Sequence, residues 1–577
     1  MNIMDAIKNY EFWCENPYFD AQTKQELKQI ANDKKEIEDR FYKDLEFGTG
    51  GLRGVIGAGT NRMNIYTVRK ATQGLANYII KEHGESRGVA IAYDSRNMST
   101  EFAEETALCM AGNGIKAYIF PVLHPTPMLS FAMRELGCIA GIVITASHNP
   151  AEYNGYKVYW EDGAQITAPK DKQIIDEVNA VTDYTSLKTM KKQDAEKAGF
   201  YNIIDKSIDD KYIQNLKNLV IRPDIIKKQA NKLKIVYTPL HGTGNLYVRR
   251  ILSELGFENV YVVSEQEMPD GNFPTAPYPN PEDPKAFTLA LELAKKVDAD
   301  IVLATDPDAD RLGMYAKDET DGTYKRFTGN MTGMFMLEYI LSQKKELGKL
   351  NQNGAVVTTI VSGKMAKKIA EKYNVKLIET LTGFKYIGEQ IKFFERDNSF
   401  EFLFGYEESY GYLGGTHARD KDAVDAAMML CEAAAYYNEK GISICKQMQN
   451  LFNEYGYFSE DLCTVTLKGK EGLQKISDSM EYIRNNVPTK LGKYNVIEFC
   501  DYSKDEKTDM KTGEKSKTGL PKSNVLYFKL DNDAWCCVRP SGTEPKIKFY
   551  AGVKAENAEL SQKELGELMN VVSKLAE

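Results

Sequence analysis

Short apolar runs alternate with longer stretches of helical period along most of this chain. In the first such stretch, RGVAIAYD (87–94) and IKAYIF (115–120) have the composition of buried strands, and residues 100–114 between them have a helical pattern that ends at a glycine. This alternation is typical of parallel α/β units, in which a helix connects neighbouring strands. The sequence therefore predicts an α/β fold.

The same alternation occurs twice more. The second stretch has strand patterns at 232–238, 259–263 and 301–305, and the third has them at 354–361 and 400–405. A chain of 577 residues is longer than a domain with a single hydrophobic core usually is. At a typical domain size of roughly 150 residues, this length corresponds to about four domains. We therefore expect three α/β domains and one further domain.

The last part of the chain changes character from about Glu460. A polar, lysine-rich run at 501–519 predicts a mobile surface loop, and the strand patterns NVLYFKL, DAWCCVRP and KIKFYAGV follow it. These patterns predict a smaller α+β domain that is closed by a C-terminal helix. The expected domain limits are 1–205, 206–323, 324–455 and 456–577.

Charge and hydropathy restrict the class of function. The formal net charge is -8, whereas binding to nucleic acid or to an anionic membrane needs a dominant basic field, so we expect neither partner. No apolar run approaches the roughly 18 residues that span a bilayer, and the start MNIMDAIKNYEFW has no apolar signal-peptide core. The nine cysteines show no zinc-ligand spacing. We expect a cytoplasmic globular protein.

The run TASHNP places Ser147 just beyond a predicted buried strand, where open α/β sheets bind ligands. An isolated serine at such a position is more often a turn cap than a nucleophile. A catalytic role for Ser147 therefore depends on what other chemistry the chain carries.

Three aspartates alternate in ATDPDADRLG, directly after the strand pattern IVLAT: Asp306, Asp308 and Asp310. Carboxylates so close together repel one another, which raises their pKa values unless a cation neutralises them. A hard divalent ion suits such a set of oxygens, and we expect Mg²⁺. An EF-hand would need glycine and glutamate where this chain has Arg311 and Lys317, so that alternative fails, and a solvated acidic turn is the remaining one.

Two further loops carry groups that suit a phosphorylated sugar. RPSGTEP joins the guanidinium of Arg539 to two hydroxyls and the amide of Gly542, a set that can bind a phosphate dianion. GYEESYGY places Glu407, Glu408 and Ser409 after the strand pattern FEFLFG, where they can bind sugar hydroxyls. The structural alternatives are a plain turn between strands and an acidic helix N-terminus.

Together with FGTGGLRG at 47–54 and TGFKYI at 382–387, these motifs resemble the α-D-phosphohexomutase superfamily over nearly the whole chain. They are most similar to the phosphoglucomutase and phosphomannomutase branch, which also includes phosphopentomutase-type enzymes. The resemblance implies four domains around a central cleft, three mixed α/β domains plus a smaller C-terminal α+β domain. It also implies Mg²⁺ as cofactor, glucose 1,6-bisphosphate as activator and small-molecule sugar phosphates as partners.

The resemblance also implies a role for each matching residue. Ser147 becomes a phosphoserine, and its phosphate joins Asp306, Asp308 and Asp310 as a metal ligand. Catalytic help is implied for His148, Lys157 and Arg53. Substrate binding is implied for Arg311, Thr382, Gly383, Lys385, Glu407, Ser409, Arg539, Ser541, Gly542 and Thr543. We also expect Lys157, near other cations, to have a lowered pKa and to accept the proton of a sugar hydroxyl.

The chain departs from some members of this superfamily at one position. Gly411 stands two residues after the serine of the sugar loop, where those members have histidine; His417 lies nearby in sequence. The acid or base on that side is therefore not assigned. We expect interconversion of glucose 1-phosphate and glucose 6-phosphate, with mannose or pentose phosphates as alternative substrates. Two rival functions are a phosphatase that is phosphorylated on Asp306 and a non-catalytic sugar-phosphate binding protein.

Overall fold

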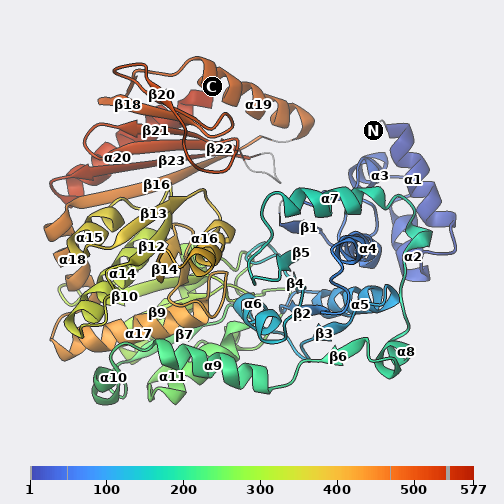
Figure 1. The fold of residues 1–577 in the computed structure, drawn as a ribbon, viewed down its shortest axis with the longest axis horizontal. Helices are drawn as coiled ribbons and strands as arrows, with labels where there is room; N and C mark the ends of the chain where they lie inside the picture. Colours follow the sequence, from blue (N-terminus) through green and yellow to red (C-terminus); the bar gives the residue numbers. More distant parts are fainter. Residues whose placement is uncertain (1–2, 49, 468, 541–545, 577) are drawn as a thin grey trace. The chain divides into compact units, whose positions relative to one another are not determined.

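The computed structural model describes residues 3–48, 50–467, 469–540 and 546–576 (Figure 1). The chain divides into two compact units. The first comprises Met1–Ala316, Gly388–Arg396 and Gly411–Tyr436, and the second comprises Lys317–Ile387, Asp397–Tyr410 and Tyr437–Glu577. Within the described ranges, no helix combines the length and the apolar composition that crossing a membrane requires.

A six-stranded sheet in the order β1-β5-β4-β2-β3-β6 forms the first α/β domain of the first unit. Its strands are β1 (Gly51–Val55), β2 (Val89–Tyr93), β3 (Ala117–Ile119), β4 (Ala140–Ile144), β5 (Tyr153–Trp160) and β6 (Tyr201–Ile203). Its helices are α4 (Ile65–Lys81), α5 (Ser99–Gly112), α6 (Thr126–Glu135), α7 (Lys170–Ala180) and α8 (Lys192–Lys197), with a 3-10 turn at Tyr184–Ser186. β2 and β4 are buried along their whole length and pair in parallel, as the apolar runs predict, whereas β5 runs antiparallel to β4 and β1.

Three helices precede this sheet: α1 (Ile3–Glu15), α2 (Ala21–Gln29) and α3 (Lys34–Phe41). Trp13 is buried in the apolar cluster that they form, and its ring stacks on Phe19 with the ring centroids 4.2 Å apart. The hydroxyl of Tyr66, at the start of α4, donates a hydrogen bond of 2.9 Å to the carboxylate of Asp20. The three helices are thus joined to the sheet domain by both apolar and polar contacts.

The second α/β domain of the first unit has strands in the order β10-β9-β7-β8. They are β7 (Ile235–Thr238), β8 (Val260–Val262), β9 (Ile301–Thr305) and β10 (Leu312–Lys317). Its helices are α9 (Ser207–Leu219), α10 (Pro223–Gln229), α11 (Gly244–Glu254), α12 (Ser264–Glu267) and α13 (Thr288–Val297), with a 3-10 turn at Pro284–Phe287. The buried β9 pairs in parallel with β7 and antiparallel with β10, so the aspartate loop lies at the carboxyl end of an internal strand.

In the second unit, β12 (Gly354–Thr359) pairs in parallel with β13 (Lys376–Thr380) on one side and β14 (Glu401–Glu407) on the other. Further elements of this part of the chain are β11 (Tyr324–Phe327), α14 (Gly329–Glu346), α15 (Met365–Tyr373), α16 (Phe384–Asp397), β15 (Gly411–Leu413), α17 (Ala423–Glu439) and α18 (Ile444–Tyr455). β15, most of α16 and most of α17 belong to the first unit. The third predicted α/β stretch is confirmed.

The C-terminal domain has an antiparallel sheet in the order β16-β23-β22-β21-β18-β19-β20, with β17 paired to β18. Its elements are β16 (Tyr457–Thr466), α19 (Gly469–Asn485), β17 (Lys490–Leu491), β18 (Tyr494–Asp501), β19 (Glu506–Asp509), β20 (Lys515–Ser516), β21 (Leu526–Leu530), β22 (Trp535–Pro540), β23 (Lys546–Ala555), α20 (Ala558–Val572) and a 3-10 turn at Ser573–Ala576. The predicted α+β domain is confirmed.

The prediction of a mobile loop at 501–519 is wrong, because β19 and β20 form a hairpin there that extends the sheet from β18. The carboxylate of Asp505 accepts a hydrogen bond of 2.7 Å from the Thr518 hydroxyl, which joins the two ends of the hairpin. The charged composition of this segment reflects the solvent exposure of its side chains rather than an absence of strands.

Candidate active site

Ser147 and Asp306 meet beyond the carboxyl ends of β4 and β9. The Ser147 hydroxyl donates a hydrogen bond of 2.7 Å to Asp306 Oδ2. Ser147 is 3% exposed and has a left-handed backbone with a φ of 52°. A left-handed conformation costs a non-glycine residue about 1–2 kcal/mol, so the surrounding contacts must impose it.

Arg96 holds the loop that carries this serine. Its guanidinium donates hydrogen bonds to the main-chain carbonyls of Ser147 (2.5 Å), Pro150 (2.8 Å) and Tyr153 (3.1 Å), and also to that of Asn149. The Arg96 side chain is completely buried. A rigid planar set of donors that contacts four carbonyls of one loop fixes the main chain around Ser147.

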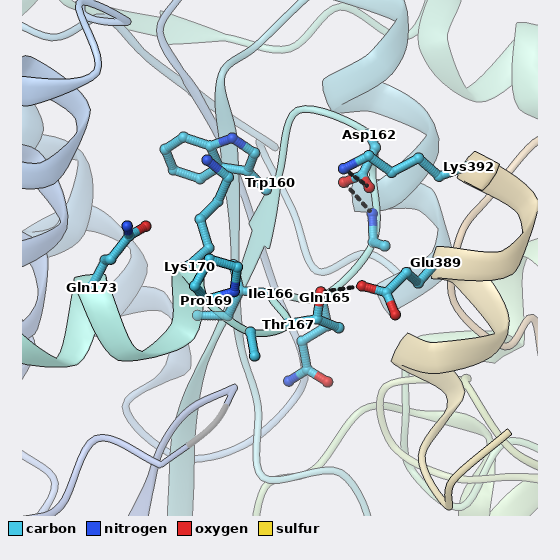
Figure 2. A pocket seen from close by; sticks show the side chains of 12 residues that line it. Trp160, Asp162, Gln165, Ile166, Thr167, Pro169, Lys170, Gln173, Glu389 and Lys392 are labelled. Atoms are coloured by element: carbon cyan, nitrogen blue, oxygen red, sulfur yellow. Dashed lines mark hydrogen bonds and ion pairs between the residues drawn. The ribbon is translucent and has the colours of Figure 1, made fainter. Parts of the chain in front are cut away.

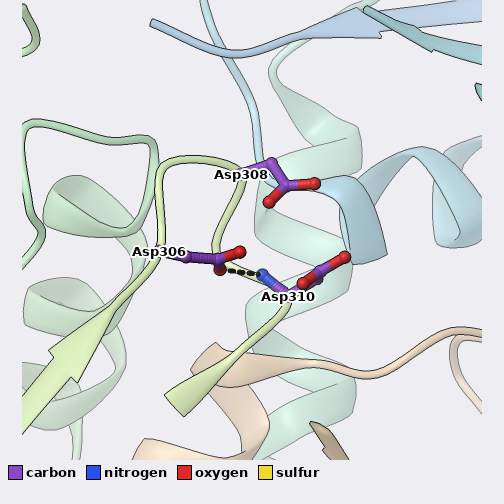
Figure 3. Close-up of side chains that lie close together, drawn as sticks. All are labelled: Asp306, Asp308 and Asp310. Atoms are coloured by element: carbon purple, nitrogen blue, oxygen red, sulfur yellow. Dashed lines mark hydrogen bonds between the residues drawn. The ribbon is translucent and has the colours of Figure 1, made fainter. Parts of the chain in front are cut away.

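The three aspartates surround a common point (Figure 3). One carboxylate oxygen from each of Asp306, Asp308 and Asp310 lies within 4.8 Å of the others, and all three residues are buried. Asp306 Oδ1 accepts hydrogen bonds from the main-chain N–H groups of Asp310 (3.1 Å) and Arg311 (2.9 Å). The loop's own backbone therefore holds one oxygen of Asp306, and the other accepts the Ser147 hydroxyl.

The two lysine ammonium groups contact Asp308 and Asp310 through Oδ2 of each carboxylate. Lys157 Nζ lies 2.8 Å from Asp308 Oδ2 and 3.2 Å from Asp310 Oδ2, and Lys421 Nζ lies 2.9 Å from Asp310 Oδ2. Thr126 donates its hydroxyl to Asp308 Oδ2 at 2.9 Å. The buried Oδ1 atoms of both aspartates have no hydrogen-bond partner among the described residues. Buried oxygens without donors fit a hard divalent cation, so this set of residues can hold one.

The pKa values of the three carboxyl groups diverge. Burial and the two neighbouring carboxylates raise the pKa of Asp306 well above its ordinary value. Burial also disfavours the ionised forms of Asp308 and Asp310, but Lys157 and Lys421 outweigh it, and both pKa values lie below the ordinary one. Repulsion between the carboxylates is expected to raise these pKa values unless a cation neutralises it, and it does so for Asp306. For Asp308 and Asp310 the cations are the ammonium groups of Lys157 and Lys421, which come from distant parts of the chain.

Lys157 lies on β5, opposite Val143 of β4 in the antiparallel register. Burial disfavours its ammonium form, but the carboxylates of Asp308 and Asp310 outweigh burial, so the pKa of Lys157 is raised. The prediction of a lowered pKa is wrong, because its nearest charged groups are carboxylates rather than cations. Lys157 is therefore a charged hydrogen-bond donor in this arrangement.

His148 and Arg53 also lie at the serine loop. His148 Nδ1 is 3.1 Å from Ser147 Oγ, and burial together with the nearby Arg311 and Arg53 cations lowers the pKa of His148 well below its ordinary value. Arg53, on β1, donates a hydrogen bond of 3.3 Å to the side chain of Asn149. Both residues, which the resemblance marks as catalytic, are thus brought to Ser147 by the fold.

Arg311 forms contacts within the protein. Its guanidinium pairs with the carboxylate of Glu282, and its Nε lies 4.0 Å from Asp310 Oδ1. Contact between Arg311 and a substrate stays a prediction.

Lys421, Thr126 and Arg96 belong to this site but were not predicted from the sequence. Lys421 follows β15 and also lies 3.3 Å from Asp420 Oδ1, while the other oxygen of Asp420 accepts the Tyr159 hydroxyl at 2.6 Å. For Lys421, the one signal in the sequence is its position between two aspartates in ARDKDA. Such a signal does not reveal the distant partner that the fold supplies.

His417 lies in a different environment. It is 7% exposed, and its Nε2 is 2.8 Å from Asp422 Oδ2, which also accepts the Tyr212 hydroxyl at 2.7 Å. Asp422 Oδ1 accepts the main-chain N–H of Val424 at the start of α17. His417 is therefore part of a buried polar network that supports the start of this helix.

The second unit brings together part of the predicted substrate-binding set. Arg539, at the end of β22, donates a hydrogen bond to the hydroxyl of Thr382. Gly383, which follows, has a φ of 116° and precedes α16. Glu407 is the last residue of β14. Three other predicted residues lie outside the described residues: Ser541, Gly542 and Thr543.

Glu408 follows β14 and accepts the hydroxyl of Thr359 at 2.9 Å. Burial and the neighbouring Glu407 raise the pKa of Glu408 to about 7. Lys385, on α16, has its Nζ 5.3 Å from the centre of the Tyr386 ring. Roles of Lys385, Glu407 and Ser409 in sugar binding stay predictions.

A pocket of about 190 Å³ lies elsewhere in the first unit (Figure 2). Trp160 lines it, and two polar pairs flank it: Asp162 with Lys392 at 3.1 Å, and the Thr167 hydroxyl with Glu389 at 2.7 Å. None of the residues predicted for the site is among its lining residues. We assign it no chemistry.

A serine that is hydrogen-bonded to a buried group of three carboxylates, at the strand ends of an α/β fold, defines a candidate metal-assisted phosphoryl-transfer site. The sequence matches the α/β/α domains I, II and III of phosphoglucomutase/phosphomannomutase at residues 44–185, 210–321 and 328–455, and the C-terminal domain at 505–565. These matches cover more than half of the chain, which therefore belongs to the phosphoglucomutase/phosphomannomutase family, a class of phosphosugar mutases. The family and the fold class predicted from the sequence are confirmed.

Individual relatives agree with this assignment. The chain is 36% identical over 551 residues to the phosphoglucomutase of Staphylococcus epidermidis, a match that covers 94% of this chain and 97% of that protein. It is also 36% identical over 534 residues to the phosphoglucomutase of Staphylococcus aureus, covering 92% and 94%.

Two solved structures have a similar fold. One is the open form of pp63/parafusin, a phosphoglucomutase from Paramecium, with a TM-score of 0.67 at 18% identity, covering 93% of this chain and 95% of that one. The other is a phosphoglucomutase/phosphomannomutase family protein from Burkholderia thailandensis, with a TM-score of 0.64 at 18% identity, covering 92% and 97%. At such identity the likeness shows the fold alone.

Proposed function

We propose that this protein is a phosphoglucomutase, which interconverts glucose 1-phosphate and glucose 6-phosphate through phosphorylated Ser147 and glucose 1,6-bisphosphate. The observation that carries the proposal is the hydrogen bond of 2.7 Å between Ser147 and Asp306, which places the serine hydroxyl beside the candidate metal ligands. The 36% identity to relatives named phosphoglucomutase favours glucose phosphates over mannose and pentose phosphates, which are the alternative substrates.

The ion that suits the site is Mg²⁺, held by Asp306, Asp308, Asp310 and the phosphate on Ser147. Mg²⁺ usually binds through a few carboxylates together with a phosphate oxygen. When bound, it would stabilise the negative charge that develops on the transferring phosphoryl group.

The residues of this chain position the exchange. In the first half-reaction, the bond between phosphorus and Ser147 Oγ breaks while a bond to the sugar hydroxyl oxygen forms, and the hydroxyl proton ends on Ser147 Oγ. The resulting bisphosphate turns round, and its other phosphate returns to Ser147 by the reverse exchange. The lowered pKa of His148 keeps its ring neutral, and its Nδ1 lies 3.1 Å from Ser147 Oγ. The ring can therefore stabilise the new Ser147 hydroxyl by hydrogen bonding. Lys157 and Lys421 supply positive charge beside the carboxylates.

Substrate binding is proposed for the residues that match the substrate-binding motifs of the family. One is Arg311; Arg53 is proposed instead to assist catalysis, together with His148 and Lys157. The others are Thr382, Gly383, Lys385, Glu407, Ser409 and Arg539. Ser541, Gly542 and Thr543, which lie outside the described residues, are proposed to bind the phosphate that does not react. The domain limits of 1–205, 206–323, 324–455 and 456–577, and a cytoplasmic location, are part of the same proposal.

Comparison of kcat/KM for glucose 1-phosphate, mannose 1-phosphate and ribose 1-phosphate tests the substrate. The assay contains Mg²⁺ and the matching bisphosphate, and we expect the highest value for glucose 1-phosphate. A higher value for another sugar phosphate would reassign the main substrate.

The same assay distinguishes the two rival functions. Release of inorganic phosphate at the rate of substrate loss would indicate a phosphatase that uses Asp306. Binding of glucose 1-phosphate without turnover would indicate a non-catalytic binding protein.

A further inference from the structure

Thr126 contacts Asp308 through both its main chain and its side chain. The Thr126 hydroxyl donates to Asp308 Oδ2 at 2.9 Å, and the Thr126 main-chain N–H donates to the Asp308 carbonyl, also at 2.9 Å. Both residues are 0% exposed. Thr126 is the first residue of α6, so the start of this helix is fixed to the aspartate loop after β9.

This contact determines which oxygen of Asp308 remains for an ion. Asp308 Oδ2 accepts both the Thr126 hydroxyl and, at 2.8 Å, Lys157 Nζ, which uses its two lone pairs. Asp308 Oδ1 is buried and has no hydrogen-bond partner in the described part of the chain. Turning the carboxylate so that both oxygens contact one ion would break the bonds to Oδ2.

The two donors to Oδ2 differ in how far they can move. Lys157 has a long, flexible side chain that also contacts Asp310 at 3.2 Å, so it can follow a shift of the carboxylates. The Thr126 hydroxyl is one bond from Cβ, and its backbone is held by the Asp308 carbonyl. Thr126 is therefore the rigid donor of the pair.

The number of oxygens that a carboxylate offers affects which ion the site prefers. Mg²⁺ requires near-octahedral geometry at about 2.0–2.1 Å, whereas Ca²⁺ takes about 6–8 oxygens at about 2.3–2.6 Å and often binds a carboxylate through both oxygens. We propose that Thr126 is a positioning residue that restricts Asp308 to coordination through Oδ1 and so favours Mg²⁺ over Ca²⁺. The inference rests on the metal site of the proposed function.

Variants of Thr126 separate the hydroxyl from the shape of the side chain. Thr126→Val removes the hydroxyl at nearly constant shape, and Thr126→Ser keeps it. Thr106→Val is the matched control, because Thr106 is also 0% exposed and donates its hydroxyl, at 2.8 Å, to the Phe102 carbonyl within α5. The melting temperature of each full-length variant reports whether it folds.

Calorimetric titration of the metal-free full-length proteins with MgCl₂ and with CaCl₂ gives both dissociation constants. We expect Thr126→Val to raise the Kd for Mg²⁺ about tenfold, the lower end of the effect of removing a residue that orients a metal ligand. The Kd for Ca²⁺ should rise less, so the preference for Mg²⁺ falls. Thr126→Ser and Thr106→Val should keep the preference of the wild type.

Three results would overturn the inference: a wild type that binds no Mg²⁺, a Thr126→Val variant with unchanged Kd for Mg²⁺, or equal weakening of both ions. If Thr126→Val does not fold, Thr126→Ala, which lacks the same hydroxyl, is titrated in its place and judged by the same criteria. A different result would contradict the proposed function: a wild type that binds Mg²⁺ but does not convert glucose 1-phosphate.

Discussion

Ser147 Oγ and Asp306 Oδ2 lie 2.7 Å apart although 159 residues separate them in the chain. The serine follows β4 of one sheet and the aspartate follows β9 of another, so this hydrogen bond joins the two α/β domains of the first unit. The proposed reaction at Ser147 therefore depends on the contacts that hold both loops in place.

Arg96→Lys should lower kcat by about tenfold to a hundredfold, because a displacement of about 1 Å of a reacting group can cost that much. Lysine cannot donate to the four carbonyls that the guanidinium holds. KM for glucose 1-phosphate should change little, since the serine moves and not the substrate. Steady-state kinetics give both constants.

Arg69→Lys is the control for this experiment, because it alters another partly buried arginine, whose Nε lies 2.7 Å from Glu105. It should leave kcat unchanged. Equal kcat values for Arg96→Lys and the wild type would contradict a positioning role of Arg96.

Lys421→Met should lower kcat by about a hundredfold or more, the usual effect of removing one donor that stabilises transition-state charge. Its Nζ lies 2.9 Å from Asp310 Oδ2, so the variant leaves excess negative charge where the phosphoryl group must approach. Lys421→Arg should retain more activity, and Lys172→Met, on the exposed side of α7, should retain all of it. Full activity of Lys421→Met with glucose 1-phosphate would contradict a role of Lys421 in the proposed reaction.

Asp425→Asn should stabilise the protein at alkaline pH only. Asp425 is 0% exposed, and although the Gly414 N–H donates to it at 2.6 Å, burial raises its pKa to about 7. Asp422 also raises this pKa, and His417 lowers it. Since the ordinary value is about 3.9, the stabilisation from this group is complete below about pH 4 and is lost as the pH rises through 7.

Asparagine cannot ionise, so at pH 8.5 the variant should gain roughly 4 kcal/mol over the wild type, with a much smaller difference at pH 4.5. Melting temperatures of both proteins at the two pH values measure the effect. The same difference in melting temperature at both values would show that ionisation of Asp425 is not its cause.

Much of the fold could be predicted because apolar runs and turn residues determine local structure. The strand pattern IVLAT corresponds to β9 residue for residue, at Ile301–Thr305. The segment 501–519 was predicted wrongly, since lysine-rich composition indicates solvent exposure and does not distinguish a loop from the exposed hairpin of β19 and β20. Pairing at the edge of a sheet depends on the neighbouring strand as well as on the segment itself.

The candidate site could be predicted only where its residues form compact motifs. Ser147 and Asp306 occur in such motifs. Thr126 and Lys421 instead act through partners that are 182 and 111 residues away in the sequence, respectively. The pKa of Lys157 was predicted in the wrong direction for the same reason. Its sign depends on carboxylates from the loop after β9, which the sequence around Lys157 does not reveal.

The phosphate on Ser147 is the most direct test of the proposed function. Protein shown by intact mass spectrometry to carry no phosphate is assayed with glucose 1-phosphate and Mg²⁺, with and without glucose 1,6-bisphosphate, and Ser147→Ala is assayed in parallel. We predict that the unphosphorylated wild type is nearly inactive until the bisphosphate is added, that it then carries one phosphate on Ser147, and that Ser147→Ala stays inactive in both conditions. Full activity of the unphosphorylated protein without bisphosphate would contradict the phosphoserine mechanism.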